Sequence, residues 1–127
     1  MGIVFVGCSS TPVRNAQGVD AISLTVKADS GESILVIQRD RSSYAAPASM
    51  TIWLDDKELT SGIQNGEEIQ IVIPNGRHDI RAGSSKVDRG NRITLSADHE
   101  IILFQAKPVM GLFSAKFNLT QLGKKKL

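Results

Sequence analysis

The chain has 127 residues, of which 41% are hydrophobic and 22% are charged, and its formal net charge is +2. These values suit one soluble globular domain and exclude the disordered, collagen-like and membrane-embedded classes. The positive sign comes from Lys124, Lys125 and Lys126, because without them 12 of the 15 basic residues remain against 13 acidic ones. A nearly neutral body lacks the basic surface of nucleic-acid-binding proteins, so no nucleic-acid partner is expected.

The N-terminal stretch contains Cys8, the only cysteine of the chain. Apolar residues at positions 3–6 and the small residue Gly7 precede it, and a mostly polar run, residues 9–12, follows it. This arrangement resembles the cleavage site of bacterial lipoproteins, in which the thiol of the cysteine receives a lipid. Cys8 is therefore the predicted lipidation site, and residues 1–18 are predicted to form a lipobox-like N-terminus and tether.

The same stretch has a second interpretation. Signal peptides have a basic region and roughly 7–15 apolar residues, whereas here the apolar run is shorter and no basic residue precedes it. In this alternative, residues 3–6 form a short strand and Cys8 is a small buried hydrophobic residue, as free cysteines commonly are. Lipidation predicts a membrane-anchored protein of the cell envelope, and burial of Cys8 predicts a cytoplasmic protein.

A single domain is predicted over residues 19–122, with a solvated basic tail over residues 123–127. Apolar and polar residues alternate over residues 22–27, which predicts a first strand because successive side chains of a strand point to opposite faces. Continuous apolar runs at residues 34–37 and 101–104 predict two central strands that are buried on both faces. Aliphatic residues therefore supply most of the expected core.

Residues 50–82 define strands and turns most clearly. Apolar and other side chains alternate over residues 50–54, which predicts a strand with one face on the core. Residues 55–57, Asp-Asp-Lys, predict a tight turn, because aspartates tolerate turn geometry and bond to their own backbone. The chain is then expected to return through residues 58–60 and to close a short hairpin.

A second hairpin is expected further along this stretch. Isoleucines recur at every second position over residues 68–73, which predicts a strand with one apolar face. Pro74 ends this strand because it donates no backbone hydrogen bond, and Asn75 with Gly76 supplies the positive backbone angles of a hairpin turn. Residues 77–82 are therefore expected to run back beside the preceding strand.

The last third of the chain continues the same pattern. Residues 92–95 predict a strand, residues 107–112 contain Pro108 and predict a bend or short edge piece, and residues 115–120 predict a final strand. About eight strands then follow one another with turn signals at roughly 8–12 residue spacing, and no stretch has a helical period. The predicted fold class is all-β, an antiparallel β-sandwich of the immunoglobulin-like or a related type.

One part of this pattern resembles a known family. A hydrophobic strand closed by Asp55, Asp56 and Lys57, then a polar link and the sequence IVIPNGRHDI, is similar to the bacterial envelope β-domains called PEGA and to related lipoprotein sandwich domains. Those families have an Asp-Gly-Lys turn and, further on, Pro, Gly, Lys and His. This chain has Asp56 where Gly is usual and Asn75 inserted before Gly76. The resemblance covers residues 50–82 and implies a β-domain of the bacterial envelope.

No catalytic or metal-binding pattern is recognisable in the sequence. His78 and His99 lie on different predicted strands, without a cysteine partner and without the spacing of a metal ligand set. The acidic pairs at residues 55–56 and 67–68 are neighbours in sequence, so on a strand their side chains point to opposite faces. No serine lies in a nucleophile elbow and no glycine pattern cradles phosphate. We therefore expect no enzyme activity, no cofactor and no metal.

The candidate ligand contacts are Tyr44 and Trp53. Residues 40–49 form the longest irregular connection within the domain, and loops on a rigid sheet often carry binding residues. Trp53 alternates with core residues, which places it on the opposite face, either exposed or covered by the loop that contains Tyr44. Stacking of the two rings on a ligand is one interpretation, and a small hydrophobic cluster is the other.

Together these observations predict a non-catalytic interaction module of the cell envelope, anchored by lipid on Cys8, with an envelope protein or a glycan as partner. Recognition would use loops or a sheet edge. The alternative is a soluble cytoplasmic β-domain that assembles with a partner protein. An enzyme that uses His78 or His99 is the least favoured of the three hypotheses. Oligomeric state is not predicted.

Overall fold

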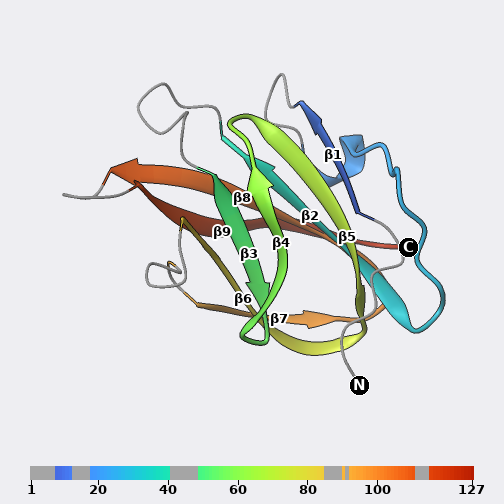
Figure 1. The fold of residues 1–127 in the computed structure, drawn as a ribbon. Coiled ribbons are helices and arrows are strands. Elements are labelled where there is room, and N and C mark those ends of the chain that lie inside the picture. The colour runs from blue at the N-terminus through green and yellow to red at the C-terminus, as the bar shows by residue number, and fades with distance from the viewer. Residues whose placement is uncertain (1–7, 13–17, 41–48, 85–89, 91, 111–114) are drawn as a thin grey trace.

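The computed structural model describes residues 8–12, 18–40, 49–84, 90, 92–110 and 115–127. Within these residues the chain forms nine strands and one short 3-10 helix, arranged as two sheets that face each other (Figure 1). The elements are β1 (Cys8–Pro12), η1 (Val19–Ala21), β2 (Glu32–Arg39), β3 (Met50–Leu54), β4 (Lys57–Ile63), β5 (Glu67–Pro74), β6 (Gly76–Gly83), β7 (Ile93–Ala97), β8 (Glu100–Met110) and β9 (Ala115–Lys126).

The nine strands divide into a five-stranded and a four-stranded sheet. Sheet A has the order β1-β5-β2-β8-β9, and sheet B has the order β4-β3-β6-β7. Every described ladder is antiparallel except the one between β2 and β8, which run parallel. The predicted all-β sandwich is confirmed, with one strand more in the described residues than the eight or so expected.

The hairpin predicted around residues 55–57 is confirmed. β3 and β4 pair antiparallel, and the backbone angle φ is 52° at Asp55 and 64° at Asp56. Two consecutive positive φ values are typical of the two-residue turn whose twist matches that of the strands it joins. β4 continues through Gly62, whose φ of 75° accompanies a shift of the pairing register, as in a β-bulge.

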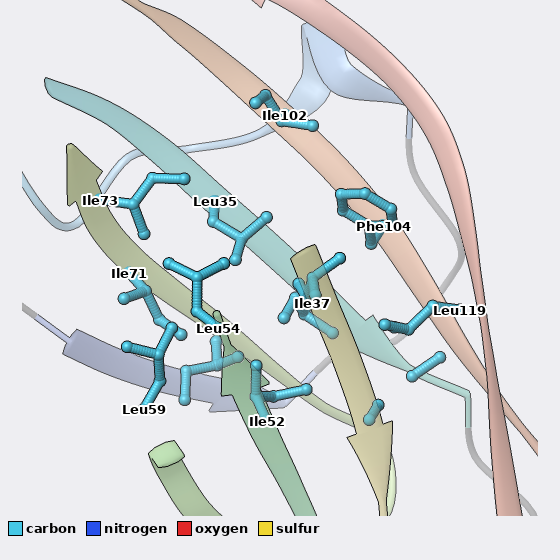
Figure 2. Close-up of a cluster of buried hydrophobic side chains, with 14 of the residues drawn as sticks. Leu35, Ile37, Ile52, Leu54, Leu59, Ile71, Ile73, Ile102, Phe104 and Leu119 are labelled. Carbon is cyan, nitrogen blue, oxygen red and sulfur yellow. The ribbon is translucent and has the colours of Figure 1, made fainter. Parts of the chain in front are cut away.

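The two apolar runs predicted as central strands are confirmed. β2 and β8 are neighbours inside sheet A, and their alternate side chains enter two clusters. The inner cluster fills the space between the sheets and includes Leu35, Ile37 and Phe104 (Figure 2). The outer cluster, on the face of sheet A that points away from sheet B, consists of Ile34, Val36, Ile101 and Leu103.

The first strand predicted over residues 22–27 is wrong. These residues join neither sheet, and Ile22, Val26 and Ala28 instead pack, with Val19, on the outer cluster of sheet A. We call residues 19–28 the strap. A segment that lies across a sheet alternates apolar and polar residues much as a strand within the sheet does, so the pattern alone did not separate the two arrangements.

The hairpin predicted at residues 75–76 is also wrong. β5 belongs to sheet A and β6 to sheet B, so the turn carries the chain from one sheet to the other. Only Gly76 of the two turn residues has a positive φ, 121°. The amide of Asn75 donates to the carbonyl of Gly31, which continues the pairing of β5 with the turn before β2 rather than with β6.

The bend or short edge piece predicted over residues 107–112 is, in its described part, the end of the continuous strand β8. β8 runs from Glu100 to Met110 and pairs with β9 throughout, including the pair of Pro108 with Phe117. The ladder between β8 and β2 ends at Ala106. Pro108 therefore lies beyond the part of β8 that has strands on both sides, which is where a sheet tolerates proline.

The two segments predicted to flank the domain, residues 1–18 and 123–127, both contain strand residues in their described parts. Cys8–Pro12 form β1 in the region predicted as a tether, and β9 continues to Lys126 in the region predicted as a tail. β1 and β9 are the two edge strands of sheet A. Lysines on an edge strand oppose pairing with other chains. In the part of the chain that the structure describes, no helix has the length and hydropathy needed to cross a membrane.

Candidate functional site

The predicted lipidation site, Cys8, is the first residue of β1, and its Cα lies opposite that of Ile71 in β5. β1 is the outermost strand of sheet A, with β5 on one side. The orientation of the Cys8 side chain lies outside what the structure describes. The structure thus places the residue at a sheet edge, and its lipidation stays a prediction.

The two candidate contact residues have different outcomes. Tyr44 lies outside the described residues. Trp53 is in β3, between Glu58 of β4 and Arg81 of β6 in the pairing register, and is only 3% exposed. It is absent from the inner cluster that contains Ile52, which agrees with its place on the other face of sheet B. A role for Tyr44 and Trp53 in ligand contact stays a prediction.

Polar side chains gather where the β3–β4 turn meets β6. The imidazole of His78 is buried; its Nδ1 lies 2.6 Å from Oδ2 of Asp55 and its Nε2 lies 2.8 Å from the carbonyl oxygen of Pro74. Both partners are hydrogen-bond acceptors, so both contacts are hydrogen bonds only when both ring nitrogens carry a proton. The ring of His78 thus lies between the carboxylate of Asp55 and the carbonyl of Pro74.

Asp55 holds the β3–β4 turn against β6 through two further hydrogen bonds. Its Oδ1 accepts from the backbone N–H of Asp79 at 2.9 Å, and its own backbone N–H donates to the carbonyl of Asp79 at 2.8 Å. Desolvation raises the pKa of Asp55, but the hydrogen bonds from His78 and Asp79 and the charges of His78 and Lys57 together exceed it. The pKa of Asp55 is therefore lowered below its usual value of 3.8.

This shift predicts an acid-sensitive contribution to stability. A carboxyl group with a lowered pKa in the folded state stabilises the fold above its unfolded pKa, and this stabilisation is lost as pH falls through the folded pKa. We expect Asp55→Asn to lower the free energy of unfolding at pH 6 by only about 1 kcal/mol, because solvent reaches Asp55 and screens the pair. The loss should be smaller at pH 3, because the stabilisation by the Asp55 carboxylate fades as pH falls. Urea unfolding at several pH values measures this difference.

Asp56→Asn is the matched control, because it changes the adjacent turn residue and leaves the contact between Asp55 and His78 in place. Asparagine also tolerates positive φ, so the turn itself should keep its geometry. An effect of Asp55→Asn that is equal at pH 3 and pH 6 would contradict the assignment.

The contacts of His78 are those of a structural brace. Nε2, the nitrogen that a catalytic base would present to a substrate, faces the carbonyl of Pro74. Pro74 ends β5 in sheet A, whereas Asp55 follows β3 in sheet B, so the ring joins the two sheets at this end. Within the described residues, no group of three or more His, Cys, Asp or Glu side chains is placed to bind a metal ion.

Asn75 connects several turns that lie far apart in the sequence. Its Oδ1 accepts from Ser33 Oγ at 2.7 Å and from the backbone N–H of His99 at 2.8 Å, and its Nδ2 donates to the carbonyl of Ser30 at 3.3 Å. The hydroxyl oxygen of Ser33 also accepts from the backbone N–H of Glu100 at 3.0 Å. The sequence indicates only a turn role for Asn75, because nothing local in the sequence marks these distant partners.

No family model, curated protein or solved structure matches the chain. The likeness to PEGA domains accordingly rests on residues 50–82 alone.

Arg39 carries a positive charge into the interior at the end of β2, where it is 1% exposed. Its Nη1 donates to the carbonyl of Ile63 in β4 at 2.5 Å, and its guanidinium carbon lies 4.8 Å from the ring centre of Phe117 in β9. Burial lowers the pKa of Arg39, and the negative charge of Glu67 opposes that effect. The residue is in phase with Leu35 and Ile37, which is the one sequence signal that it points inward.

The three C-terminal lysines lie next to carboxylates of the same chain. Their ammonium groups are within 4 Å of acidic side chains from η1, from the β7–β8 turn and from β8. The pairs are Lys124 with Glu100 at 3.7 Å, Lys125 with Asp20 at 3.4 Å, and Lys126 with Asp98 at 3.0 Å. The pairs of Lys125 and Lys126 are exposed to solvent and add little stability.

Proposed function

We propose that the chain is a non-catalytic interaction module of the bacterial cell envelope, anchored by lipid on Cys8. The observation that carries this proposal is the position of Cys8, which follows Gly7 and an apolar run in the sequence and opens the edge strand β1. An edge strand has a neighbour on one side only, so a lipid attached there has a route away from the sheet. The resemblance of residues 50–82 to PEGA domains supports the same location.

The polar clusters support a binding role over a catalytic one. The ring nitrogens of His78 face Asp55 and Pro74, and the side-chain amide of Asn75 bonds to other turns of the sandwich. Groups used in this way stabilise the scaffold that holds the loops. The proposed partner is an envelope protein or a glycan, with Tyr44 and Trp53 as its candidate contacts.

Detergent phase partitioning of the chain made in a bacterium tests the anchor. We expect the chain to enter the detergent phase and to incorporate labelled fatty acid, and we expect Cys8→Ser to abolish both, because the thiol is the attachment point. The double variant Cys8→Ser, Ser10→Cys is the control. It keeps one thiol in this stretch, but the cysteine no longer follows Gly7 directly. A chain that stays in the aqueous phase with or without Cys8 would rule out the proposal.

A soluble assembly domain is the second candidate function. It is favoured by the strand at Cys8–Pro12, because residues that pair with β5 occupy the place where lipoproteins have a polar tether. In this alternative Cys8 is a structural residue and the partner is another cytoplasmic protein. Aqueous partitioning of the unmodified chain, together with a loss of stability in Cys8→Ser, is the result that this alternative predicts.

A further inference from the structure

The strap covers the outer face of sheet A from one side to the other. Near its start, Val19 packs against Gly123 of β9, and Asp20 lies 3.4 Å from Lys125 of the same strand. Further along, the strap bonds to Gln70 of β5. Since β9 and β5 lie on either side of β8 and β2 in the sheet, the strap crosses both central strands.

Gln70 binds the strap through two backbone groups and through the hydroxyl of Thr25, which donates to Gln70 Oε1 at 3.2 Å. Its Nε2 donates to the carbonyl of Ser23 at 2.9 Å, and its Oε1 accepts from the backbone N–H of Thr25 at 2.9 Å. A side-chain amide has the same donor and acceptor as a peptide group, so Gln70 substitutes for a neighbouring strand. Gln70 is 1% exposed, and its Nε2 also donates to Glu68 Oε2 at 3.1 Å.

The strap and the surface under it differ in burial. Every side chain of the outer cluster is at most 6% exposed, whereas no residue between positions 18 and 31 is buried. Ile22 and Val26 are half-buried against the outer cluster, and Leu24 between them is 41% exposed. The strap thus contacts the sheet through apolar residues four positions apart and through its backbone around Leu24. Segments with few buried contacts open locally before the core does.

We propose that the outer face of sheet A is a docking site for an extended peptide segment, which the strap occupies in the free chain and a partner polypeptide occupies after displacing the strap. The segment of the partner would have aliphatic residues four positions apart and a residue midway between them that points to solvent, as Leu24 does in the strap. The outer cluster would receive its side chains, and the amide of Gln70 would bond to its backbone. This inference does not depend on lipidation of Cys8.

The strap itself supplies the probe for a test. A fluorescently labelled peptide of residues 18–31 is titrated into the full chain, into Val26→Asp and into Leu24→Asp, with anisotropy as the readout. The Val26 change places a charge against the outer cluster and releases the strap, whereas the Leu24 change adds the same charge on the exposed side. We expect Val26→Asp to bind the peptide at least tenfold more tightly than the other two proteins, because their own strap competes at high effective concentration.

Gln70→Ala in the Val26→Asp background should weaken peptide binding about tenfold, because the backbone of the peptide loses its partner. Equal binding by all three proteins, or binding that Gln70→Ala leaves unchanged, overturns the proposal. Loss of cooperative unfolding in Val26→Asp also overturns it, since the strap would then be an integral part of the core.

Hydrogen exchange in the unchanged protein gives a second, independent readout. We expect amides of residues 22–28 to exchange at least a hundredfold faster than those of β2 and β8, because the strap opens without unfolding of the sheets. Exchange of the strap at the same rate as β2 and β8 would show that it leaves the sheet only on global unfolding, and the proposal would fail.

Discussion

The variant Gly90→Ala is expected to lose about 3 kcal/mol of folding stability. Gly90 has a φ of 71°, and a Cβ at this position would overlap with the carbonyl oxygen of Ala82 in β6 and lie 2.8 Å from that of Phe117 in β9. Those two strands belong to different sheets, so relief of the overlap requires the sheets to separate locally. Unfolding in urea, followed by circular dichroism, measures the loss.

Gly31→Ala is the control for this prediction. Gly31 lies in the turn before β2, where a Cβ would have no atom within 4 Å, and its φ is not in the left-handed region. We expect a change within about 0.5 kcal/mol, as for an ordinary surface substitution. Similar stability of the two variants would mean that Gly90 does not make the close approach between β6 and β9.

The second large effect is expected for Phe104→Ala. Phe104 is 0% exposed in the inner cluster between the sheets, which contains side chains of both (Figure 2). Removal of its ring should lower the free energy of unfolding by about 4 kcal/mol, from lost burial and from the cavity that remains. Thermal or urea unfolding measures this change.

The neighbouring residue tests burial on the other face of β8. Leu103 is also 0% exposed, but it belongs to the outer cluster under the strap. We expect Leu103→Ala to cost about 2 kcal/mol, less than Phe104→Ala, because the strap can settle into the space that is left. Leu122→Ala, at a side chain that is 45% exposed, is the control and should change little. A larger effect at Leu103 than at Phe104 would contradict this ranking.

Predictions from the sequence succeeded where the cause is local. The turn at Asp55 and Asp56 needs two residues that tolerate positive φ, and both have it. The runs at residues 34–37 and 101–104 are apolar at every position, and both are buried on two faces. In each case the residues that determine the structure are next to one another in the chain.

The candidate site was predictable only in part. Cys8 and Trp53 were singled out from the sequence, and the structure places them at a sheet edge and in a buried position, respectively. The roles of His78, Asn75 and Gln70 were missed. Their partners include residues that lie 23 to 47 positions away in the chain, which no spacing rule reports.

The sequence by itself determined the strands that contain residues 34–37, 50–54 and 101–104 and the tight turn at residues 55–57, because alternation, apolar runs and positive φ act between adjacent residues. Only the tertiary structure decided which sheet each strand joins. Pro74 and Asn75 end β5 in either topology, but β6 joins sheet B because its partners are β3 and β7. Residues 22–27 have the pattern of a strand, but β2 already pairs with β5 on one side and β8 on the other. These residues therefore pack on the outer face of sheet A, where they cover apolar side chains of β2 and β8.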